Sequence, residues 1–549
     1  MFRRTHDQQL DMFKDVTGQL SLTAQKKLLD EHSWNQLFYQ HFTSQVDESI
    51  YSVLYCKNNG RPNASIRMIL GMILIKEMQG YSDEQLFDRC EFDLRHRYAL
   101  GLYHLEQMPP VAATYYDFRA KVAQYLEETG EDLMAKTFTH VTAQQLSTFD
   151  ISGEKIRMDS KLLQSNIVRQ NRLQFILQAI GSALKSTDIS ALQSYLTEEQ
   201  YALVQKLQNK TASNVTYHQS SAQKEQMLTD CGYIIRALIQ AKYITSDSTL
   251  YKIYAEQYDN CDQDEDQDIT PKLPQDIASS SVQSIHDPTA AYRKKGKAEN
   301  VQTVKGFHSN ITETCDQADK PNLITDVQTT PAHVSEDTFL APAIQNTQQM
   351  LKGSQIQQVI TDGGYDSINN REQMKSEDAP AWKIQKLKGA KRAYDMSYDD
   401  QGHLQVTQVK TQQACKVTWR PKIEKYSIKS PQGHNRYMTK SQVENYINCL
   451  QIIKQSTDED YNLRANVEAT IHEVFHRLGR GYKIKYRGII KCHWYVLFRA
   501  IGVNLGRIGR HIEVFSTILT KMILTTRIKC LNLISSYLCN IKYSPRYAI

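Results

Sequence analysis

The sequence predicts a mixed α+β protein: an all-helical N-terminal domain, an α/β core interrupted by a helical insertion, and a helical C-terminus. Three observations support this fold class. Residues 1–145 carry apolar side chains at helical spacing. Two strand-like segments end on acidic residues, at positions 159 and 362. Between them, residues 164–255 return to helical spacing.

Length and composition limit the class of protein. A chain of 549 residues predicts three or four domains, and 40% hydrophobic with 23% charged residues is typical of soluble globular proteins. We find no uncharged apolar stretch of membrane-spanning length and no apolar segment of a secretory signal after Met1. Ten cysteines without a CxxC pair favour reduced thiols over a disulfide framework or a zinc ribbon.

The expected helical N-terminal domain covers residues 1–145. Its clearest helix has Ile66, Ile69, Leu70, Ile73 and Leu74 on one face. Ser82 followed by Gln85 has the spacing of a capping box and predicts the start of the next helix.

The expected α/β domain covers residues 146–510. Strands are predicted at 155–159, 301–308, 323–330 and 356–361, with a helix at 336–351. The helical insertion spans about 164–255. An acidic linker follows at about 256–285, because residues 256–268 hold seven acids and no base. Residues 380–455 are weakly patterned and predict no element, and residues 511–549 predict a helical tail.

Three carboxylates stand out among the sixty acids. Asp159 and Asp362 follow predicted strands, and Glu468 lies at the margin of the apolar face of a helix that begins at Arg464. Converging carboxylates favour a hard divalent cation, and two such ions can assist an in-line phosphoryl displacement. Any one of these acids taken alone could instead be a turn residue, a helix cap or a salt-bridge partner.

The charge is unevenly distributed. From Arg464 to Ile549 the chain has 15 Lys or Arg and three acids, a balance of +12, so the preceding residues sum to −6. Near Glu468, Tyr461 and Arg464 complete a Y-x-x-R-x-x-x-E array. Basic and aromatic residues alternate downstream, at Lys483, Lys485, Tyr486, Arg487 and Lys491. This pattern favours a phosphate backbone as partner, although a basic tail that only aids solubility has the same charge.

At this point the chain resembles the DDE transposases of bacterial insertion sequences, in the branch with an N-terminal helical domain and a ribonuclease H-like catalytic domain. The resemblance covers residues 50–510. In the N-terminal part it rests on Gly60-Arg61-Pro62, Tyr81 to Leu86, Asp93 to Leu102 and Thr114 to Arg119. In the catalytic part it rests on Met158-Asp159-Ser160, His286-Asp287-Pro288, Gly306-Phe307-His308, Thr330-Pro331-Ala332, Thr361 to Ser367, Arg464 to Glu468 and Lys485 to Gly488.

The resemblance implies that Asp159, Asp362 and Glu468 are the catalytic and metal-binding triad, with Mg²⁺ or Mn²⁺, as two ions, as cofactor. It implies that Tyr461 and Arg464 belong to the family signature. The lysine that usually follows the glutamate by seven positions is Phe475 here. Relatives often carry a Cys-rich knuckle, of which Cys415 and Cys449 remain, too few for a tetrahedral zinc site.

The implied reaction is cleavage of double-stranded DNA at the terminal inverted repeats of the element, followed by strand transfer into target DNA. The implied setting is a homo-oligomer in the bacterial cytoplasm, associated with the nucleoid and not with a membrane. Two alternatives remain at this stage: a ribonuclease H-like nuclease without strand transfer, and a catalytically decayed transposase that only binds DNA.

Overall fold

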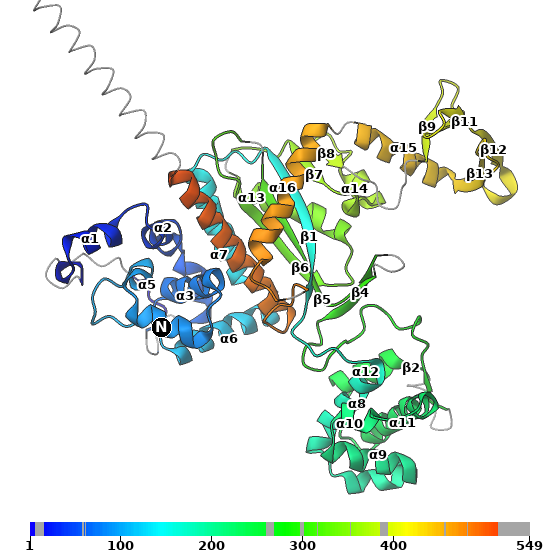
Figure 1. The fold of residues 1–549 in the computed structure, drawn as a ribbon, viewed down its shortest axis with the longest axis horizontal. Coiled ribbons are helices and arrows are strands. Elements are labelled where there is room, and N and C mark those ends of the chain that lie inside the picture. Colours follow the sequence, from blue (N-terminus) through cyan, green and yellow to red (C-terminus); the bar gives the residue numbers. More distant parts are fainter. Residues whose placement is uncertain are drawn as a thin grey trace, which may run out of the picture.

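The computed structural model describes residues 1–5, 16–56, 60, 62–259, 268–296, 301–315, 317–351, 353–384, 393–454, 457–479 and 481–513, and gives the backbone alone at 452, 453 and 458–461. Figure 1 shows the N-terminal helices beside one central sheet, from which a helical unit and a β unit project. Within these ranges, none of the helices has the length and apolar content needed to span a bilayer.

The N-terminal domain is helical, as predicted. Its α-helices are α1 (Leu22–Leu29), α2 (Trp34–His41), α3 (Ile66–Gln79), α4 (Asp83–Phe92), α5 (Leu94–Ala99), α6 (Ala112–Thr129) and α7 (Leu133–Thr148). The predicted apolar face of α3 is buried in the main core. The predicted capping box is also confirmed, since Ser82 Oγ accepts the Gln85 N–H at 3.1 Å and Gln85 Oε1 accepts the Ser82 N–H at 3.0 Å.

The central sheet is mixed. Its strands are β1 (Lys155–Gln164), β4 (Ala291–Lys295), β5 (Gln302–Thr314), β6 (Ile324–Pro331), β7 (Gln358–Thr361) and β8 (Ala381–Ile384). β1 pairs antiparallel with β5, which pairs antiparallel with β4 and β6 on its other edge. On the opposite side β1 pairs parallel with β7, and β7 pairs parallel with β8.

The four predicted strands are present as β1, β5, β6 and β7, but β1 does not end at Asp159 as predicted. It continues to Gln164 because β5 pairs with it from Ile156 onward. Pairing with β7 stops at Arg157. Asp159 therefore lies inside its strand, just beyond the parallel pairing.

Helices cover the sheet and join it to the N-terminal domain. α13 (Leu340–Met350) packs against β6 and α7, whereas α16 (Asp458–Phe475) packs against β1 and β7. A helix over residues 489–513 links both parts, because Arg499 donates to the Val474 carbonyl of α16 at 2.9 Å and to the Glu77 carbonyl of α3 at 3.0 Å. The rest of the predicted C-terminal tail, 514–549, lies outside the described residues.

The helices expected at about 164–255 form a separate cluster with its own core. It contains α8 (Arg172–Ala183), α9 (Glu198–Asn209), α10 (Ala212–Thr216), α11 (Ser221–Gln240), α12 (Thr249–Gln257), β2 (Tyr258–Asp259) and β3 (Thr270–Pro271). The structure differs from the expected linker over 256–285, because Tyr258, Ile269 and Val282 are buried in this core. Residues 260–267 lie outside the described ranges.

A β unit fills the segment for which the sequence predicts no element. Its strands form two three-stranded sheets: β9 (Tyr394–Tyr398), β10 (Leu404–Gln408) and β11 (Gln413–Ala414), then β12 (Lys416–Arg420), β13 (Lys425–Lys429) and β14 (Asn435–Thr439). α15 (Lys440–Lys454) leads back to the central sheet (Figure 1). The strands are short and share one small core, so no single strand shows a strong pattern.

Candidate functional site

Asp159 and Asp362 are neighbours across two parallel strands. The register of β1 and β7 pairs Arg157 with Ile360, and the same register continued brings Asp362 beside Asp159. Asp362 follows β7 directly, and its Oδ1 accepts the Gly364 N–H at 2.7 Å, which caps the 3-10 turn η8 (Gly363–Tyr365). Sheet register and turn geometry thus fix both carboxylates.

Glu468 reaches this pair from α16. The helix lies on the sheet because Val467, Ile471 and Val474 are buried on one face. The Glu468 side chain is 67% exposed, as expected for the margin of that face. α16 therefore presents the Glu468 carboxylate at the surface, on the helix that packs against β1 and β7.

The Arg464 guanidinium lies among the three predicted carboxylates. Its Nη2 is 3.5 Å from Asp159 Oδ2 and 4.0 Å from Asp362 Oδ2. Its Nη1 is 3.7 Å from Glu468 Oε1, one helical turn away. The structure thus brings Asp159, Asp362 and Glu468 together around one cation, although no two of them are close in sequence.

The electrostatics of the cluster follow from burial. Burial raises the pKa of the Asp159 carboxyl to about 6, against the opposing effect of Arg464, and the carboxylates of Asp362 and Glu336 raise it further. The pKa of the Tyr365 hydroxyl is also raised, by burial first and then by the same acids. A concentration of negative charge of this kind favours a cation.

A buried ionic network holds α16 in place. Glu313 on β5 is fully buried, and its Oε1 is 2.6 Å from Arg157 Nε on β1. Its Oε2 is 2.6 Å from Arg507 Nη1 and accepts the Thr470 hydroxyl of α16 at 2.7 Å. Arg157 also donates to the Leu463 carbonyl of α16 at 2.6 Å. Two strands and two helices therefore fix the helix that carries Arg464 and Glu468.

A fourth acid at the site was missed in the sequence. Glu336 begins the 3-10 turn η7 (Glu336–Phe339) and is buried. A Cβ added at Gly364 would lie 1.8 Å from Glu336 Oε2 and 2.8 Å from Asp362 Oδ1, so the two carboxylates flank the same glycine. One acid in an irregular segment has no spacing that distinguishes it, which is why no sequence signal singled it out.

Basic side chains surround Glu336 on its other side. Its Oε1 lies 3.6 Å from His308 Nε2, 3.7 Å from Arg293 Nη2 and 3.7 Å from Lys295 Nζ. His308 Nε2 is also 2.8 Å from the hydroxyl of Ser160, the residue after Asp159. The Glu336–His308 contact thus extends the polar cluster along β1 and β5.

The predicted DNA-binding residues are distributed unevenly around the site. Arg464 lies at its centre, whereas the Tyr461 side chain lies outside the described residues. Downstream, Lys483 Nζ donates to the Ile167 carbonyl at 3.4 Å, Lys485 Nζ to the Gly80 carbonyl at 3.3 Å, and Arg487 Nε to the Asn166 carbonyl at 2.8 Å. Lys491 is exposed at the start of the helix over 489–513.

Tyr486 connects the two domains. Its hydroxyl donates to Glu77 Oε1 of α3, and its ring packs against Tyr495 at a centroid distance of 5.9 Å. Two other cations of the basic C-terminal segment, Arg499 and Arg507, are directed inward to carbonyls and carboxylates. Part of the positive charge counted in the sequence is therefore used inside the fold.

The donor chemistry of the site fits a hard divalent cation, because Asp159, Asp362 and Glu468 all offer carboxylate oxygens. Each of the three carboxylates lies within 4.0 Å of the Arg464 guanidinium. Among the described residues, no group of three or more His, Cys, Asp or Glu side chains is arranged closely enough to hold a metal ion. Arg464 Nε is buried and has no hydrogen-bond partner, so the guanidinium is held by charge more than by directed bonds.

The residues at which the sequence departs from the family pattern, Phe475 and the two remaining cysteines, are buried. Phe475 is 1% exposed and packs in the main core, so the position expected to hold a lysine points inward. Cys415 and Cys449 are buried and unpaired, as predicted, and Cys449 Sγ lies 3.3 Å from Asp366 Oδ2.

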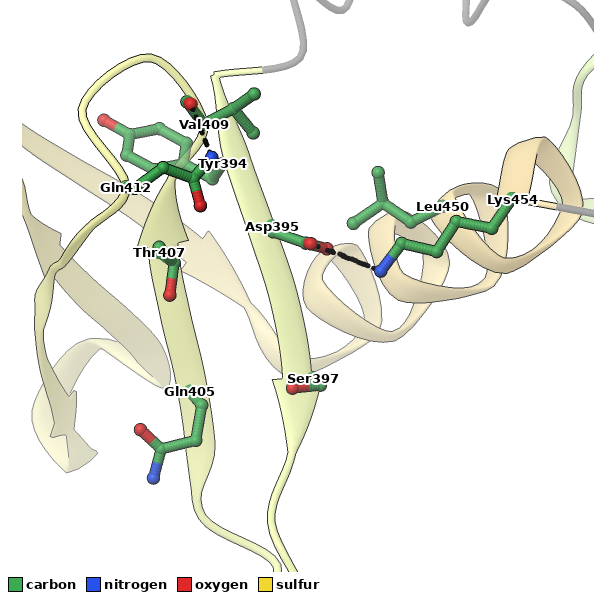
Figure 2. A pocket seen from close by; sticks show the side chains of 9 residues that line it. All are labelled: Tyr394, Asp395, Ser397, Gln405, Thr407, Val409, Gln412, Leu450 and Lys454. Atoms are coloured by element: carbon green, nitrogen blue, oxygen red, sulfur yellow. Dashed lines mark hydrogen bonds and ion pairs between the residues drawn. The ribbon is translucent and has the colours of Figure 1, made fainter.

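The cavity in Figure 2 is a separate feature. It has a volume of about 330 Å³ and lies between β9, β10 and α15, where Lys454 pairs with Asp395 at 3.0 Å. None of Asp159, Asp362, Glu468 and Glu336 lines it.

The comparison with protein families gives one result. Residues 24–121 match a transposase domain, DUF772. The match begins within α1, ends within α6, and contains every N-terminal motif on which the resemblance rests. It supports a transposase family and a transposase-related role in DNA handling. No curated protein and no solved structure matches the chain.

Proposed function

We propose that the protein is a DDE-type transposase that cleaves DNA at the ends of an insertion sequence and joins the freed ends to target DNA. The observation that carries the proposal is the convergence of Asp159, Asp362 and Glu468 on Arg464. Asp159 and Arg464 lie 305 positions apart in the chain, so their contact is not a consequence of sequence proximity.

A ribonuclease H-like core forms part of the proposal. Its support is a sheet in which the antiparallel strands β6, β5 and β1 continue into the parallel strands β7 and β8. Asp159 lies in β1, the first of these strands in the chain, and Asp362 directly follows β7, the fourth. Glu468 lies on the helix that packs against both strands.

In this proposal Asp159, Asp362 and Glu468 would hold one or two Mg²⁺ or Mn²⁺ ions. When bound, the ions activate the attacking oxygen and stabilise the leaving oxygen of an in-line displacement. Arg464 is then available to bind the phosphodiester with its planar fork of donors. The buried Glu313 network keeps α16 fixed while the substrate binds.

The partners follow from the reaction. The duplex would carry the terminal inverted repeats of the element, and two ends must be held together before joining. A homo-oligomer is therefore part of the proposal, with the N-terminal helices as the candidates for end recognition or dimerisation.

The test uses the full chain and a plasmid carrying the ends of its own element. With Mg²⁺, we expect cleavage at the ends and joined products, both lost in Asp159→Asn, Asp362→Asn and Glu468→Gln while duplex binding survives. Glu372→Gln is the matched control, because it removes an exposed carboxylate from the nearby helix α14 (Ile368–Gln373).

The outcomes separate the candidates. Cleavage without joining identifies a nuclease that lacks strand transfer. Binding of ends without cleavage by the wild-type chain contradicts the enzyme and leaves a DNA-binding protein. Full activity of any of the three triad variants contradicts the assigned site.

A further inference from the structure

The sheet of the β unit formed by β12, β13 and β14 has one strongly basic face. Antiparallel pairs place directly opposed residues on the same side of a sheet. The register opposes Lys416 to Lys429 and Arg420 to Lys425. All four side chains are exposed and share the outward side, which we call the basic face.

The other side of the same sheet is packed. Ile428 is fully buried and Met438 is 5% exposed, and both lie in the core shared with β9, β10 and α15. The sheet is therefore fixed with its apolar side inward and its basic face toward solvent.

The arrangement of like charges on the basic face is unfavourable for folding. Like charges directly opposed across two strands destabilise a sheet, and here this occurs twice, at the two ends of β12. Within the described part of the chain, none of the four cations has a carboxylate within ion-pair distance. Residues 401–443 hold eight Lys or Arg and a single acid, Glu424. Such a local conflict is expected where a polyanionic partner supplies the missing charge.

We propose that the basic face binds the phosphate backbone of duplex DNA at a place separate from the carboxylate site. The two cation pairs lie four residues apart on β12, or about 14 Å along an extended strand. This spacing is comparable with the width of about 12 Å of the major groove, so the pairs can contact phosphates on both strands. Tyr437, opposed to Ser427 between the pairs, is 50% exposed. The choice of DNA as the polyanion rests on the proposed function.

The β unit is anchored to the site by α15. Arg371 of α14 donates to the Asn445 carbonyl of α15 at 2.9 Å and binds Asp366 through two contacts of 2.6 Å. Asp366 directly follows the η8 turn that Asp362 caps. DNA held on the basic face would thus be connected through α15 and α14 to the segment that carries one of the three carboxylates.

The test is the salt dependence of duplex binding by the full chain. A quadruple variant replaces Lys416, Arg420, Lys425 and Lys429 by Gln. Its matched control replaces the exposed Lys185, Lys206, Lys210 and Lys224 of the helical insertion by Gln, for the same loss of charge. Fluorescence anisotropy of a labelled duplex is measured over a series of salt concentrations.

We expect the slope of log K against log salt to fall in magnitude by about 3 to 4 in the quadruple variant, since each phosphate contact contributes about 0.9. Affinity at low salt should fall at least about tenfold, whereas the control keeps the wild-type slope. Lys429→Glu separates a loss of binding from a loss of folding. It creates an opposite-charge pair with Lys416, which should not destabilise the sheet. This variant should melt no lower than wild type and still bind DNA more weakly.

Equal slopes for the quadruple variant and its control would overturn the basic face as a DNA site, and the cleavage assay would still decide the proposed function. A reduced slope in a chain that never cleaves DNA would support the face and contradict the proposed function. A wild-type chain that binds no duplex contradicts both.

Discussion

The Arg464 guanidinium lies 3.5 Å from the Asp159 carboxylate, although 305 residues separate the two in the chain. The same guanidinium is 4.0 Å from Asp362, so one side chain of α16 balances two acids of the central sheet. This relationship joins the helix to the strand ends and defines where a substrate phosphate or a cation can bind.

The first prediction concerns this contact. Arg464→Gln removes the charge that lowers the pKa of Asp159, so that carboxyl should be protonated to a greater extent near neutral pH. Together with the lost phosphate contact, this should reduce DNA cleavage by about 100-fold or more. Arg464→Lys keeps the charge without the planar fork and should recover part of the rate. Single-turnover cleavage from pH 5 to 9 measures both effects, and an unchanged rate in Arg464→Gln would exclude a catalytic role.

The second prediction concerns the close packing of Glu336 on Gly364. In Gly364→Ala the new methyl group collides with the Glu336 carboxylate, which must then move away from His308. We expect a lower free energy of unfolding and weaker cleavage. Removing the carboxylate as well, in Gly364→Ala/Glu336→Ala, should relieve part of the collision. The two substitutions should therefore be coupled by about 0.5–3 kcal/mol in a double-mutant cycle.

Gly181→Ala serves as the control for this cycle. Gly181 lies in α8, where the nearest atom to an added Cβ is 3.9 Å away, so alanine should be neutral or stabilising. If the effects of the two substitutions on the free energy of unfolding are additive, the contact between Gly364 and Glu336 does not contribute to stability.

The third prediction concerns pH and stability. Burial raises the pKa of Asp326 on β6 to about 6, although Asn346 and Gln328 donate to its carboxylate at 2.8 and 2.7 Å. The folded protein thus binds this proton more tightly than the unfolded chain. The stabilising effect is complete below about pH 4 and is lost as the pH rises through 6, an amount of about 3 kcal/mol.

Asp326→Asn removes this titration while keeping the size of the side chain. The difference in free energy of unfolding, wild type minus variant, should therefore fall between pH 4 and pH 7. Urea denaturation of both proteins across this range measures the difference. The contributions of groups that titrate in both proteins cancel in it. A difference that stays constant with pH would contradict the raised pKa.

Local patterns in the sequence predicted much of the fold. The buried face of α3, the capping box at Ser82 and the strands β5, β6 and β7 depend on residues within one element, so spacing alone indicates them. The β unit was not predicted, because its core is shared among short strands. The end of β1 was misplaced because pairing with β5, a distant segment, continues the strand past Asp159.

The sequence by itself determined which acids were candidates and where the helical and strand-like segments lie, because side-chain type and periodicity are properties of the chain. Only the tertiary structure decided which charges meet. Sheet register brings Asp159 and Asp362 together, and the packing of α16 adds Arg464 and Glu468. The sequence holds eight Lys or Arg and one acid over residues 401–443, but only strand pairing and burial decide that four of these cations share one face and that Glu336 joins the site.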